Sequence, residues 1–86
     1  MRMTRKHLEA KVDIVNSMLG FDPDALEYNT IGSIQLYSAY GATQIHRVVN
    51  DAHAVDALST LGTMRETAEF LSGMIAALRI TQEVTR

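Results

Sequence analysis

The stretch "SIQLYSAYGATQIHRVVN", residues 33–50, decides the fold. Apolar and polar residues alternate along it, and this period of two is typical of a half-buried β-strand. Gly41 interrupts the alternation and permits the backbone angles that a tight turn demands. We therefore predict a β-hairpin of two strands, 33–40 and 43–50, joined by a two-residue loop at Gly41-Ala42.

In this register the aliphatic side chains share an inner face, which holds Ile34, Leu36, Tyr40, Ile45 and Val49. Arg47 also falls on the inner face, so its long side chain must extend to an edge to keep the charge in water. Tyr37 is expected opposite His46 on the outer face, beside Gln35. A one-residue slip, or a bulge at Gly41, would exchange the two faces.

Helical periodicity flanks the hairpin on both sides. Residues 4–19 carry an apolar stripe behind Thr4, a suitable N-cap, and Gly20 suits the C-terminal end. Residues 63–80 begin with Thr63 and Glu66, the S/T-x-x-E pattern of a capping box. The apolar positions expected to face the core are Leu8, Val12, Val15 and Leu19 in the first helix, and Met64, Ala68, Leu71, Ile75 and Leu78 in the second.

A third, weaker strand is expected at residues 54–59, after a turn at residues 50–53. The predicted order is helix, three-stranded antiparallel meander, helix. Both helices are expected on one face of the sheet, which gives an α+β class. The 86 residues suffice for a single small domain, 1–86.

Composition narrows the classes of function. The chain has no cysteine, so disulfides, thiolate metal sites and cysteine nucleophiles are excluded. Its formal charge of −2 does not favour a polyanion partner, and we expect no nucleic acid. No apolar run is long enough to span a membrane, and no secretory signal is expected. We expect a cytoplasmic protein.

The polar residues of the hairpin do not predict an active site. Ser38 and His46 fall on different faces, although a nucleophile and its base must lie within hydrogen-bond reach. His46, Asp51 and His53 have side chains that can ligate zinc, but their spacing matches no defined site. We therefore predict no catalytic residue, no metal and no cofactor.

Two other features indicate contacts. Arg2, Arg5 and Lys6 form a basic cluster where the helix dipole disfavours cations, so helix stability does not explain it. A solvated helix start and an acidic or nucleic-acid partner are both compatible with it. Small residues on the second helix, at positions 72, 73, 76 and 77, suggest close packing against the first helix or against a second subunit.

Several ordered residues resemble those of small orphan proteins encoded by prophages and other bacterial mobile elements. In that family a "G-x-x-x-L-x-x-A-Y-G-G" stretch precedes an "R-x-x-N" strand end and a "T-K-R-E-L" helix start. The matching residues here are Gly32, Leu36, Ala39-Tyr40-Gly41, Arg47, Asn50, Ser59, Thr63, Arg65-Glu66, Leu71 and Gly73. The chain departs from the pattern at Ala42, at Met64 and in the turn after Asn50, which lacks a glycine. The resemblance implies an α-β-β-β-α fold and a mobile-element origin, and it implies no activity.

The leading functional hypothesis is a non-enzymatic binding module that engages a host or phage protein. Its interface candidates are Gln35, Tyr37, Tyr40, His46 and Arg47. One alternative is an oligomer that sequesters a small molecule between Tyr37, Tyr40 and Arg47. Another is a weak nucleic-acid binder that uses the basic cluster. Because a domain of this size has a thin core, we also expect a homodimer.

Overall fold

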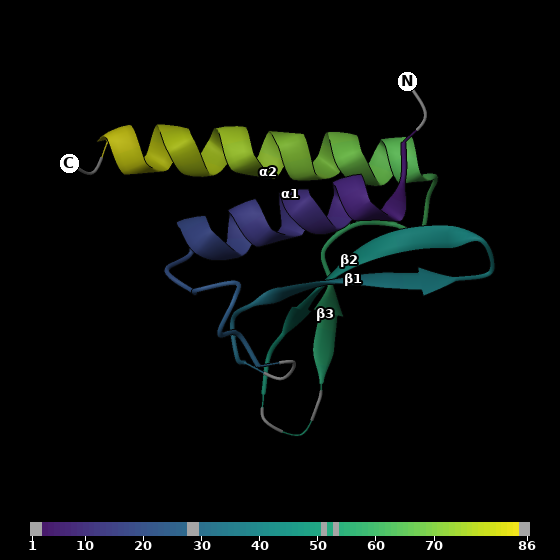
Figure 1. Cartoon of the computed structure of the whole chain (residues 1–86), viewed down its shortest axis with the longest axis horizontal. Helices are drawn as coiled ribbons and strands as arrows, with labels where there is room; N and C mark the ends of the chain where they lie inside the picture. Colours follow the sequence, from purple (N-terminus) through teal and green to yellow (C-terminus); the bar gives the residue numbers. More distant parts are fainter. Residues whose placement is uncertain (1–2, 28–29, 51, 53, 85–86) are drawn as a thin grey trace.

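The structure, a computed structural model, describes residues 3–27, 30–50, 52 and 54–84. Its elements are α1 (Arg5–Met18), β1 (Ile34–Ala39), β2 (Ala42–Val48), β3 (Val55–Ala57) and α2 (Met64–Val84). The strands form one antiparallel sheet in the order β1-β2-β3. The predicted α+β fold is therefore confirmed, with a three-stranded meander between two helices (Figure 1).

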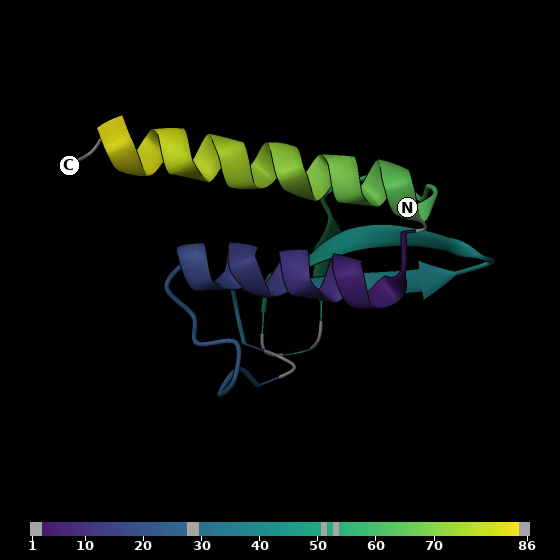
Figure 2. The same cartoon turned by 45° about the horizontal axis from the view of Figure 1, so that its top comes forward.

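Both helices lie on the same side of the sheet and run side by side in the same direction (Figures 1 and 2). α1 packs against β1, and α2 packs against α1 and β2. Two hydrogen bonds join the helices at separate levels, from Lys11 Nζ to Ser72 Oγ and from Gln82 Nε2 to the Met18 carbonyl. The last turns of α2 extend past the end of α1 (Figure 2).

The predicted helix ends are confirmed by their caps. Thr4 Oγ1 accepts the His7 amide, and His7 Nδ1 accepts the Thr4 amide. At the other end Gly20 has a φ of +97°. The amides of Gly20 and Phe21 donate to the carbonyls of the last helical turn, which is the Schellman arrangement. Thr63 and Glu66 exchange the two reciprocal bonds of a capping box at the start of α2.

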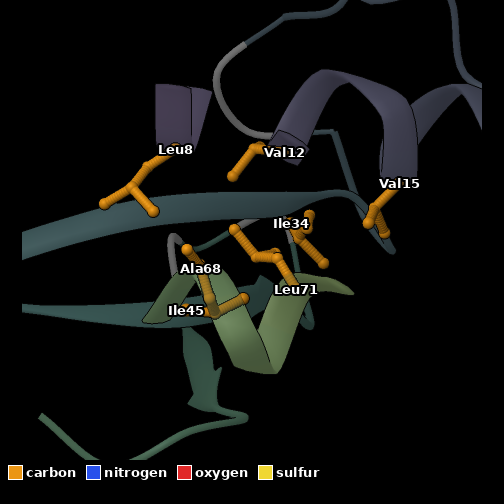
Figure 3. Close-up of a cluster of buried hydrophobic side chains, with 7 residues drawn as sticks. All are labelled: Leu8, Val12, Val15, Ile34, Ile45, Ala68 and Leu71. Carbon is orange, nitrogen blue, oxygen red and sulfur yellow. The ribbon is translucent and has the colours of Figure 1, made fainter. Parts of the chain in front are cut away.

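The core lies between the helices and the inner face of the β1–β2 hairpin (Figure 3). Alternation along the strands and a stripe on each helix supply it, as predicted. Leu19 and Met64 were also predicted to face the core, but both are exposed because they lie at the end of α1 and the start of α2, outside the cluster. The buried aliphatic cluster comprises Leu8, Val12 and Val15 of α1, Ile34 of β1, Ile45 of β2, and Ala68 and Leu71 of α2.

The hairpin register differs from the predicted one by two residues. The two-residue turn is Tyr40-Gly41, and Tyr37 lies opposite Gln44, not His46. Both turn residues have positive φ, 54° and 74°, as a type I′ turn requires. The sequence prediction expected left-handed backbone only at glycine. It therefore began the turn at Gly41 and not at Tyr40.

Two side chains are corrected with the turn, and the prediction for a third is confirmed. Tyr40 is not on the inner face but is 100% exposed at the hairpin tip. Val49 lies beyond the end of β2 and is exposed. Arg47 keeps its predicted alternation with Ile45, and its Nε donates to the Gly32 carbonyl, so the guanidinium reaches the sheet edge as expected.

The remaining differences concern lengths and one packing prediction. β3 is shorter than the predicted strand at 54–59, whereas α2 continues to Val84. The small residues of α2 do not pack closely on α1, because a Cβ added at Gly73 would meet no atom within 4 Å. Ala76 and Ala77 are likewise exposed.

Candidate interaction surface

The face of the sheet that is opposite the helices carries the candidate site. We call it the outer face and define it by Gln35, Tyr37, Gln44, His46, Val55 and Ala57. These residues alternate with the core positions of β1 and β2, or lie opposite such residues in β3. The helices pack on the other face, so neither of them covers this one (Figure 1).

An aromatic pair stands at the centre of the outer face. The rings of Tyr37 and His46 stack with centroids 4.5 Å apart and planes inclined by 16°. They are diagonal neighbours, because His46 lies opposite Gln35 and Tyr37 lies opposite Gln44. Tyr37 is 43% exposed, so the pair offers a rigid aromatic surface to a partner.

A short polar chain fixes the orientation of the histidine. His46 Nε2 lies 2.7 Å from Gln44 Oε1, and Gln44 Nε2 donates to the Ser59 carbonyl at 2.8 Å. Because an amide oxygen only accepts, Nε2 carries the proton in this arrangement. Burial lowers the pKa of His46 below its usual value of 6.5. The unfolded chain therefore takes up the second imidazole proton, on Nδ1, more readily than the folded chain. The stability that comes from this difference is lost as pH falls through 6.5 towards the folded pKa.

The sequence-predicted interface residues are only partly gathered here. Gln35, Tyr37 and His46 share the outer face. Tyr40 stands at the hairpin tip, and Arg47 belongs to the opposite face at the far end of the sheet. Tyr37, Tyr40 and Arg47 therefore line no common pocket within one chain.

Ser38 and His46 lie on different faces, as the alternation predicted. Ser38 Oγ accepts a hydrogen bond from Arg5 Nη1 at 2.6 Å, so its neighbour is a cation and not a base. The two residues do not form a nucleophile–base pair.

The basic cluster and the metal hypothesis lie partly outside the described residues, which exclude Arg2, Asp51 and His53. Arg5 forms an ion pair with Glu9 at 3.0 Å, and Lys6 is exposed. In the described ranges no group of three His, Cys, Asp or Glu side chains could hold a metal ion. In the same ranges no helix is long and apolar enough to cross a membrane.

Sequence reasoning missed a hollow in the described surface. It has a volume of about 520 Å³ and lies between the segment after β3 and the first turns of α2, with Ser59, Thr60, Glu66, Glu69 and Phe70 in its lining. Glu66 is committed to the helix cap, and the Thr63 amide and hydroxyl lower the pKa of its carboxyl. The cap motif was visible in the sequence, but the hollow depends on the path of the chain after β3.

Comparison with known proteins adds no relative. No protein-family model, no curated protein and no solved structure matches the chain.

Replacing Tyr40 with asparagine is expected to stabilise the fold by about 0.5–1 kcal/mol. A tyrosine at a φ of 54° is strained, whereas asparagine before glycine is the preferred type I′ sequence. The fully exposed ring of Tyr40 makes no packing contact that its loss would remove. Urea denaturation of the variant measures the effect. Tyr37→Asn, with the same change of residue inside β1, should not stabilise, and an unchanged or lower midpoint for Tyr40→Asn would contradict the turn assignment.

Proposed function

We propose that this protein is a non-enzymatic interaction module that binds a partner protein through its outer face and hairpin tip. The observation that carries the proposal is the Tyr37–His46 stack, held in a fixed orientation on a sheet face that the helices leave uncovered. Tyrosine is enriched among residues that dominate interface energies, because it combines a large rigid surface with one hydrogen-bonding group.

Tyr40 supports the same proposal through its cost to the fold. The residue occupies left-handed backbone at the hairpin tip, and its ring is fully exposed. A strained residue that contributes nothing to packing is better explained by function than by stability. Tyr37 and Tyr40 belong to the same hairpin, so a partner that contacts the outer face near the turn can meet both rings.

The class of partner follows from the chemistry of this surface and from the resemblance to phage and mobile-element proteins. The outer face carries aromatic, amide and aliphatic side chains, and none of its defining residues is formally charged at neutral pH. Such a surface suits a protein better than a polyanion, which requires cations. We propose a host or phage protein in the cytoplasm as the partner, and a homodimer as the form that binds it.

The test compares the wild type with a Tyr37→Ala/His46→Ala variant in affinity capture from host or phage-infected cells. A matched control replaces two exposed aliphatic residues on the helices, Ile14→Ala/Ile80→Ala. A specific partner should be captured by the wild type and the control, and its affinity for the outer-face variant should fall by about 1–3 kcal/mol.

The circular dichroism spectrum of the variant should match that of the wild type, because neither ring belongs to the core. Capture that is equal for all three proteins would contradict the proposal. Capture of nucleic acid with a steep loss of affinity as salt rises would replace the proposed partner with a polyanion.

A further inference from the structure

We propose that two copies of this chain pair through the free edge of β1, antiparallel and in register about a two-fold axis at Tyr37. The inference deepens the homodimer part of the proposed function and does not depend on the outer-face partner. It commits to a second copy of the same chain as the occupant of the edge.

The first observation is that the peptide groups of Leu36 and Ser38 point away from the sheet. Asn16 occupies both edge-facing groups of Ile34: its Oδ1 accepts the Ile34 amide at 2.8 Å and its Nδ2 donates to the Ile34 carbonyl at 3.1 Å. Outward-facing residues alternate along an antiparallel edge strand, so Leu36 and Ser38 face the same way as Ile34. Neither residue has a peptide hydrogen bond on that side among the described parts of the chain.

The second observation is that β1 lacks the usual protection of an edge strand beyond Ile34, whose edge-facing groups Asn16 covers. Its six residues, IQLYSA, contain no charge and no proline, and all six pair regularly with β2. Natural proteins shield exposed edges with charged side chains, proline, bulges or short length. The opposite edge shows such protection, because β3 has only three residues and carries Asp56. We infer from this difference between the two edges that a partner strand covers the β1 edge in the assembled protein.

The third observation is that β1 is complementary to itself. Suppose that Leu36 of one copy lies opposite Ser38 of the other. The two residues then exchange both backbone N–H···O=C hydrogen bonds, and the two-fold axis produces a second, equivalent pair. Tyr37 then lies opposite Tyr37 of the second copy on the outer face. The result is one continuous sheet with two copies of the Tyr37–His46 stack, closed by an isologous contact.

The charges of α1 fit this arrangement. Arg5, Glu9 and Asp13 recur every four residues, and α1 runs antiparallel to β1, with Arg5 at Ser38 and Asn16 at Ile34. Arg5 lies beside Ser38, and in the dimer Ser38 lies opposite Leu36 of the second copy. Leu36 is midway between Ser38 and Ile34, so the part of the second α1 at this level is the middle of the helix, which carries Glu9 and Asp13. The cation of each copy therefore meets the anions of the other.

Single-cysteine variants test the register, because the chain has no cysteine of its own. Residues opposite each other in a non-hydrogen-bonded antiparallel pair have Cα atoms about 4.5 Å apart, which a disulfide can bridge. Under mild oxidation Tyr37→Cys should become mostly disulfide-linked dimer. Gln35→Cys and Ala39→Cys should each stay at background alone but cross-link when mixed, because residue 35 of one copy lies opposite residue 39 of the other.

Two controls occupy other surfaces: Val55→Cys on the β3 edge and Ala77→Cys on the exposed side of α2. Both should stay at background, and the unmodified protein should sediment at twice the chain mass. Cross-linking of Ala77→Cys in place of Tyr37→Cys would assign the contact to α2 and overturn the proposal. Cross-linking of Gln35→Cys alone, or a monomer at every concentration, would overturn it as well. If the wild type and the Tyr37→Ala/His46→Ala variant capture the partner equally while Tyr37→Cys still cross-links, only the outer-face partner is contradicted.

Discussion

Replacing Asn16 with alanine is expected to lower the free energy of unfolding by about 3 kcal/mol, although the residue is polar and lies on a helix. Its side chain is 2% exposed and makes two hydrogen bonds to the peptide groups of Ile34. The substitution leaves one amide and one carbonyl without partners in a buried place, and each such group costs about 1–3 kcal/mol. Because Ile34 is itself a core residue, the loss would also loosen the junction between α1 and β1.

Urea denaturation measures this loss, with Asp13→Ala as the matched control on the same helix. Asp13 is exposed, so its replacement should change the free energy of unfolding by no more than about 0.5 kcal/mol. Equal effects of the two substitutions would contradict the role given to Asn16.

Asn16 also shows what helical periodicity could not reveal. The spacing of Leu8, Val12 and Val15 predicted the buried part of the apolar stripe of α1 correctly, but it gave no reason to expect a buried asparagine. Asn16 lies next to that stripe, and its burial depends on the unpaired peptide groups at the start of β1. A tertiary contact of this kind leaves no periodic signal in the sequence.

The register of the hairpin also depends on tertiary contacts that the sequence pattern does not show. In the predicted register Arg47 would lie opposite Leu36, in the middle of the inner face. In the structure Arg47 lies opposite Ile34 at the end of the strand, where it reaches the Gly32 carbonyl, and Ile45 takes the place opposite Leu36. Moving the charge to the edge and pairing two aliphatic residues explains why the turn falls at residue 40, but it does not explain why that residue is a tyrosine.

The outer face was nevertheless predictable, because the two registers differ by an even shift. An even shift preserves the side on which every residue lies, so Tyr37 and His46 share the outer face in both. The alternation along each strand therefore determined which residues form the candidate surface. It did not determine their neighbours, and it placed Tyr40 on the wrong side because the turn itself begins there.

Replacing Leu71 with alanine is expected to have an effect of similar size, a loss of about 3 kcal/mol. Leu71 is 0% exposed and lies in the aliphatic cluster shared by the helices and the hairpin (Figure 3). Truncating a buried leucine removes its transfer free energy and leaves a cavity, which together cost about 2–5 kcal/mol. Thermal or urea unfolding measures the change.

The matched control is Ile80→Ala on the same helix, where the side chain is 61% exposed and the expected change is within about 0.5 kcal/mol. Both residues are large and aliphatic, so the type of side chain does not predict different effects. The difference is expected because Leu71 lies on the buried face of α2 and Ile80 on its exposed face. A dilution series adds the oligomeric state to this comparison. If Ile80→Ala loses stability only at concentrations where the protein is dimeric, the exposed stripe of α2 is the dimer contact, and the pairing of β1 edges is wrong.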